Sequence, residues 1–179
     1  MNDSGGPTLV SFQQTSAKQV LEKLRREIAR VDSSLGDPAR DHVANAFWTA
    51  WHMHEWVWNA IRQDANLKNA VLKYRGMDDE IIDTSTSFGE ALARRFVPLK
   101  ICRLVALSPS QVEIVFAPEE DIVPLPAMTN AHDPDHAESR PATPALLIMG
   151  RSVHAARLLR EIEEYWVTLI QDCGIEHLA

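Results

Sequence analysis

The spacing of apolar residues along the chain predicts a mainly helical protein. From Ala17 to Leu35 they recur at alternating steps of four and three, on one face of a helix whose charged residues, such as Lys23 and Glu27, are expected to be solvated. After Gly36-Asp37-Pro38, a typical helix boundary, a segment at 38–66 repeats the helical spacing and holds four of the five tryptophans. Because this second helix is apolar nearly all round, we predict that it is central and buried by neighbours on several sides.

Capping and punctuation signals predict the remaining helices. Residues 67–74 form either a short helix or the end of the second one. Ser87 and Glu90 have the spacing of a capping box, so a helix is expected to begin at Ser87 and to end or kink at Pro98. The other helical segments are 99–107 and a last one that lies between Gly150 and Gly174.

Two short segments in the C-terminal half have the pattern of strands. Apolar and polar residues alternate at 111–117, and 145–149 is a short apolar run, so the two segments are expected to pair antiparallel. Residues 118–144 hold six of the ten prolines and no apolar periodicity, which predicts a long proline-rich loop.

These elements together predict an α+β fold that is mainly α, a four- to five-helix bundle with a small two-stranded antiparallel sheet. A chain of 179 residues with 45% hydrophobic composition fits one domain, at 15–179. Residues 1–14 are polar and contain glycine and proline, so we expect a flexible N-terminal arm.

Composition narrows the function classes. The formal net charge of −7 makes nucleic acid an unlikely partner, because general nucleic-acid binders carry basic patches. Two cysteines imply no disulfide framework, which favours a reducing cytoplasm. The N-terminus lacks the features of a signal peptide and no apolar run reaches 18 residues, so we expect a cytoplasmic protein without a membrane segment.

The histidines of the second helix invite a metal interpretation that helix geometry restricts. His52 and His54 are two residues apart and point about 160° from each other, so they cannot bind one ion. His52 and Glu55 share a face, and a carboxylate–histidine pair at this spacing occurs in di-metal bundles, although in the reverse order. No other helix supplies a second pair, which favours a buried, hydrogen-bonded histidine packed among tryptophans.

Other candidate chemistry is weaker still. In the proline-rich loop, His132, Asp135 and His136 are ligand types for a surface zinc or nickel site, but a solvated acidic turn is the favoured interpretation. Cys102 precedes Arg103, which would lower the thiol pKa if both faced one cleft; adjacent helical residues diverge by about 100°, so a buried structural cysteine is favoured. The chain has no nucleophile elbow, phosphate loop, dinucleotide turn or Cys-x-x-Cys, and no cofactor is expected.

The run Ala50-Trp51-His52-Met53-His54-Glu55-Trp56-Val57-Trp58, followed by Ile101-Cys102-Arg103, a strand pair and a last helix with Trp166, resembles a loose group of small uncharacterised bacterial proteins. They share an Ala-Trp-His-x-x-Asp/Glu-Trp helix, and the resemblance covers roughly residues 40–170. It invites comparison with HEPN ribonucleases, in which Arg precedes a catalytic His by four to six intervening residues. This chain has no such pair. It also departs from the loose group itself, because Leu-Val-Ala-Leu-Ser-Pro follows Arg103 where members of the group have polar residues.

Two hypotheses of function follow. The first is a non-catalytic intracellular bacterial protein that binds a protein partner or forms a homodimer. The alternative is an atypical HEPN-like ribonuclease of a defence or toxin–antitoxin system, with His52, Glu55 and Arg103 as candidate catalytic residues.

Overall fold

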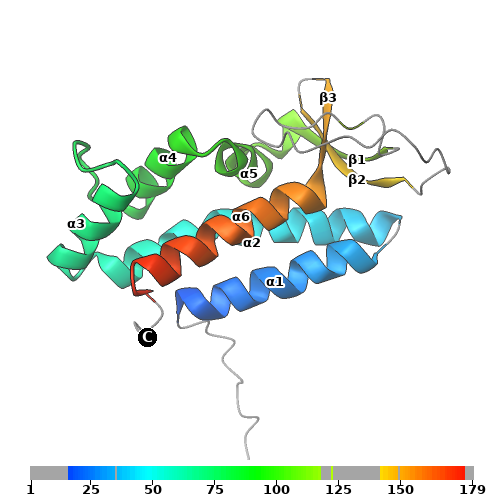
Figure 1. The fold of residues 1–179 in the computed structure, drawn as a ribbon. Coiled ribbons are helices and arrows are strands. Elements are labelled where there is room, and N and C mark those ends of the chain that lie inside the picture. Colours follow the sequence, from blue (N-terminus) through cyan, green and yellow to red (C-terminus); the bar gives the residue numbers. More distant parts are fainter. Residues whose placement is uncertain (1–15, 35, 118–121, 123–141, 149, 176–179) are drawn as a thin grey trace, which may run out of the picture.

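The structure is a computed structural model that describes residues 16–34, 36–117, 122, 142–148 and 150–175. It is a mainly helical α+β fold in which six helices accompany a three-stranded antiparallel sheet (Figure 1). The elements in chain order are α1 (Ala17–Ser33), α2 (Asp37–Ile61), α3 (Ala65–Tyr74), α4 (Ser85–Arg95), α5 (Val97–Leu107), a 3-10 turn (Pro109–Gln111), β1 (Val112–Ala117), β2 (Thr143–Ile148), β3 (Arg151–His154) and α6 (Ala155–Asp172).

The first two helices form an antiparallel pair with clear local signals. Ser16 caps α1 by accepting a hydrogen bond from the Gln19 backbone N–H. Gly36 adopts φ 69° before α2, a left-handed conformation that favours glycine, and Pro38 follows in the first turn of the helix. The predicted apolar face of the first helix is confirmed within the described residues, because its members between Ala17 and Val31 are buried.

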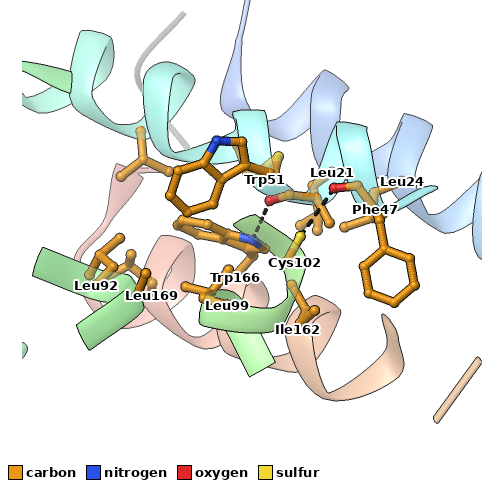
Figure 2. Close-up of a cluster of buried hydrophobic side chains, with 14 of the residues drawn as sticks. Leu21, Leu24, Phe47, Trp51, Leu92, Leu99, Cys102, Ile162, Trp166 and Leu169 are labelled. Carbon is orange, nitrogen blue, oxygen red and sulfur yellow. Dashed lines mark hydrogen bonds between the residues drawn. The ribbon is translucent and has the colours of Figure 1, made fainter. Parts of the chain in front are cut away.

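The core is built around α2, as predicted. In Figure 1, α2 runs between α1 and α5, with α6 packed across it. Two hydrogen bonds tie the neighbouring helices to the α2 backbone (Figure 2): Trp166 Nε1 donates to Ala50 O at 3.1 Å, and Cys102 Sγ donates to Phe47 O at 3.1 Å. Buried side chains from all six helices join in one hydrophobic cluster.

Several predicted helix boundaries need correction. Residues 65–74 are a separate helix, because Asp64 accepts hydrogen bonds from two of its backbone N–H groups. The described residues therefore form six helices rather than four or five. The predicted capping box was displaced by one turn. Thr84 is the N-cap and Ser87 the reciprocal partner, so α4 begins two residues before Ser87 and ends at Arg95.

The sheet has one strand more than predicted. β1 and β2 pair antiparallel as expected, with Val112 opposite Ile148. Arg151–His154, interpreted from the sequence as a turn and the approach to the last helix, instead pairs antiparallel with β2, and Gly150 at φ 78° permits the turn between them. Pro144 belongs to β2 and not to the predicted loop. Proline has no backbone N–H to donate, and Pro144 lies beyond the last residue of β2 that pairs with β3, so only β1 is paired with β2 at this position.

None of the helices in the described part of the chain combines the length and apolar character needed to cross a membrane. The predicted N-terminal arm at 1–14 lies outside the described residues. So does most of the loop predicted at 118–144, of which the structure describes residues 122 and 142–144.

Candidate functional site

The residues that the structure describes leave one side of α2 uncovered. α1, α6 and the α4–α5 pair pack against the other sides, and α6 reaches the helix at Ala50 through Trp166. At 100° per residue, Trp48 points about 160° away from Ala50. Trp48 is accordingly 54% exposed. The prediction that neighbours bury this helix on several sides is therefore confirmed, and the described residues leave open the side that carries Trp48.

We call this surface the open face of α2. It follows the helix from its second turn to the residue after its end, where Arg62 keeps helical backbone angles. All its members are exposed or half-buried, and Trp56 borders it while packing partly against the core. The open face consists of Asp41, Asn45, Trp48, His52, Glu55, Asn59 and Arg62.

Two of the three candidate catalytic residues are in contact on the open face. His52 Nδ1 lies 3.0 Å from Glu55 Oε1, across one helical turn. The Trp48 ring packs against the imidazole with 4.2 Å between ring centroids. The His52 side chain keeps 24% of its surface exposed. A carboxylate at Nδ1 orients an imidazole so that Nε2 is directed toward another group for hydrogen bonding or proton transfer.

Arg103, the third candidate, is engaged elsewhere. Its Nε donates to Glu90 Oε1 at 2.6 Å, which connects α5 to α4. Both side chains are about one third exposed. Within the described residues, no hydrogen bond or ion pair joins Arg103 to His52 or Glu55. The structure therefore pairs His52 with Glu55 and Arg103 with Glu90, and no described contact joins the two pairs directly.

His54 has a structural setting. It is buried, and its Nδ1 lies 2.6 Å from Trp51 O; because a carbonyl only accepts, Nδ1 carries the proton. Burial lowers the pKa of His54 below 6.5, against the opposing effects of the Trp51 carbonyl and the nearby charges of Glu55 and Glu90. The ring faces α4 so closely that only Gly89 fits opposite it. His54 therefore lies on the core side of α2.

Metal binding finds little support in the described residues. They contain no group of three histidine, cysteine or acidic side chains arranged to hold an ion, and His52 with Glu55 supplies at most two ligands. His132, Asp135 and His136 lie outside the described residues.

The predicted structural role of Cys102 is confirmed. Its side chain is fully buried, and burial raises the pKa of the thiol well above its ordinary value, so the nucleophilic thiolate is disfavoured. The thiol donates to Phe47 O rather than facing Arg103.

A shallow groove lies between the start of α1 and the end of α6. Its volume is about 190 Å³, and its lining includes Lys18, Arg25 and Val167. Pockets for small organic ligands usually measure about 300–1,000 Å³. The groove is also on a different surface from His52, so it adds no binding site to the open face.

Two polar clusters escaped the sequence analysis. Glu90 appeared to be part of a helix cap, and nothing in its 13-residue separation from Arg103 indicated an ion pair. Glu27, expected to be solvated, is buried against α2: Lys23 Nζ contacts Glu27 Oε1 at 3.3 Å and donates to Thr49 Oγ1 at 2.8 Å. The only sign of this burial in the sequence was the position of Glu27 at the edge of the apolar stripe of its helix.

Comparison of the chain with protein-family models, curated proteins and solved structures finds no match.

Proposed function

We propose that this protein acts without catalysis, by binding a protein partner through the open face of α2. The observation that carries this proposal is the exposure of Trp48 on a helix that is packed on three sides. A single exposed apolar residue is common on protein surfaces. Trp48, however, lies beside a hydrogen-bonded histidine–glutamate pair, and a tryptophan with polar neighbours on a rigid helix is typical of interface hot spots.

The setting of Trp48 favours binding for a second reason. The helix beneath it is held by Trp166 and Cys102, each hydrogen-bonded to a backbone carbonyl of α2. His52 also packs on the indole ring. A contact surface that is already ordered loses less conformational entropy on association than a mobile one does.

Photo-crosslinking at this position tests the proposal. p-Benzoylphenylalanine replaces Trp48 in the full chain, which is then irradiated in its native cells. We expect a covalent adduct heavier than the 20.1 kDa chain. The matched control carries the same group in place of Tyr74, an exposed aromatic residue on α3 that is 47% accessible. If position 48 gives no more adduct than position 74, the proposal is wrong.

A ribonuclease of atypical HEPN-like type is the second candidate, and the His52–Glu55 contact is the observation that favours it. A histidine oriented by a carboxylate is a common general acid or base. The test incubates the purified chain with RNA. Cleavage that His52→Ala abolishes and Asn59→Ala leaves intact, both residues lying on the open face, would refute the non-catalytic proposal. Arg103→Ala then shows whether Arg103 contributes to that cleavage.

A further inference from the structure

The members of the open face recur with the spacing of a helix–helix seam. Its seven residues follow one another at alternating steps of four and three from Asp41 to Arg62. This pattern keeps a stripe on one side of a helix over three heptads, so the stripe is long enough for a second helix to lie along it. Within the described residues, no helix of the same chain covers this stripe.

The two ends of the stripe carry opposite charges. Asp41 lies near the start of α2 and Arg62 directly after its end, about 31 Å apart at 1.5 Å per residue. Both side chains are exposed. In the described part of the chain neither forms an ion pair, although Arg40 beside Asp41 pairs with Asp37.

We propose that the occupant of the open face is a second copy of this chain, packed antiparallel along α2. This inference rests on the proposed function and names its partner. A two-fold axis near His52 places Asp41 of each copy opposite Arg62 of the other, so that the dimer gains two pairs of opposite charges. A parallel arrangement would instead place Asp41 against Asp41 and Arg62 against Arg62. The end charges therefore select both the second copy and its direction.

The same register accounts for the centre of the open face. Positions that sum to about 103 or 104 face one another across the axis, so Trp48 of one copy lies over Glu55 and Trp56 of the other. The indole, exposed in the single chain, gains apolar cover from Trp56 of the other copy. Tryptophan anchors at the centre and charged pairs at the rim are the usual anatomy of a protein interface.

Sedimentation of the full chain over a range of concentrations tests the self-association. We expect a species of twice the 20.1 kDa chain mass that Trp48→Ala abolishes. The charge reversals Asp41→Lys and Arg62→Glu should each weaken the dimer by about tenfold, because each creates two like-charge contacts. Combining both reversals restores opposite charges and should return the Kd to within about threefold of the original.

Lys73→Glu is the matched control. Lys73 is an exposed cation in the last turn of α3, as Arg62 is at the end of α2, so this reversal changes the net charge equally without touching the open face. It should leave the Kd unchanged. Circular dichroism of each variant confirms that the helices remain folded.

The remaining outcomes separate the two proposals. A chain that stays monomeric while position 48 crosslinks to a different protein overturns the second-copy inference and keeps the proposed function. A dimer that ignores Trp48→Ala and the charge reversals uses another surface and also overturns the inference. Single reversals that weaken the dimer without rescue by the double variant overturn the antiparallel register. Absence of both dimer and adduct refutes both proposals.

Discussion

Replacing Gly89 with alanine should destabilise this protein, although the same change stabilises most helices. Gly89 is the fifth residue of α4, with helical backbone angles. In an ordinary helix interior, alanine is favoured over glycine by about 0.5–1 kcal/mol. Here a Cβ at position 89 would lie 2.7 Å from His54 Cδ2 and 2.9 Å from both Cγ and Nε2.

The ring of His54 cannot readily withdraw from the added methyl group. Nδ1 is held 2.6 Å from Trp51 O, and the Trp51 ring packs against the imidazole with 4.6 Å between centroids. Overpacking a core by one methyl group typically costs about 1–3 kcal/mol. After the gain in helix propensity is subtracted, we expect Gly89→Ala to lower the free energy of unfolding by roughly 1–2 kcal/mol.

A double-mutant cycle, in which the free energy of unfolding of each variant is measured with urea, tests this effect. For a chain of this size, 1–2 kcal/mol corresponds to a fall in Tm of roughly 2–8 °C. In a His54→Ala background the clash is absent, so Gly89→Ala should instead stabilise by about 0.5–1 kcal/mol. A stabilising Gly89→Ala in the original chain, or the same loss in both backgrounds, would refute the proposed packing of His54 on Gly89.

Three further predictions concern the fold. Burial lowers the pKa of His54, so below about pH 6.5 the unfolded chain takes up a proton that the folded chain does not. The free energy of unfolding should therefore decrease as the pH is lowered through this range, by up to about 1.4 kcal/mol per pH unit. Urea titrations above and below pH 6.5 should show this dependence reduced in His54→Gln; an unchanged slope would assign it to other groups. Trp166→Phe removes the hydrogen bond to Ala50 O and leaves a gap in the core, and should cost roughly 2–4 kcal/mol by urea unfolding. Trp48→Phe, at an exposed position, should stay within about 0.5 kcal/mol, and equal losses at the two sites would contradict the assigned burial. Thr84→Ala deletes one half of the capping box and should cost about 1 kcal/mol; a change near zero, measured by the Tm, would contradict the cap.

The amino-acid sequence was sufficient for features that depend on near neighbours. The steps of three and four from Ala17 to Val31 determine which face of α1 is buried, because helix period and side-chain direction are local properties. The alternation in β1 likewise marked a strand. Helix geometry alone assigned His52 and His54 to different faces, and the structure places one on the open face and the other in the core. The expected divergence of their side chains is not observed, because the two rings stack with 6.3 Å between centroids.

Other features depended on which residues meet across the fold. Glu90 serves Arg103 rather than a helix cap because α5 packs beside α4, and neither residue carries a local signal of that contact. The strand at 151–154 forms because β2 offers a pairing edge, although its four residues show too short a pattern to identify a strand.

The open face of α2 shows the division most clearly. The sequence by itself determined a helix with large rings on every side, because composition and periodicity are written along the chain. Only the tertiary structure decided which rings are covered, because coverage depends on where α1, α5 and α6 lie relative to α2. The neighbouring helices bury Trp51 and Trp58, the latter against Phe88 of α4, and leave Trp48 exposed. Burial is a property of contacts between distant segments, so the face available to a partner emerged only once those segments were in place.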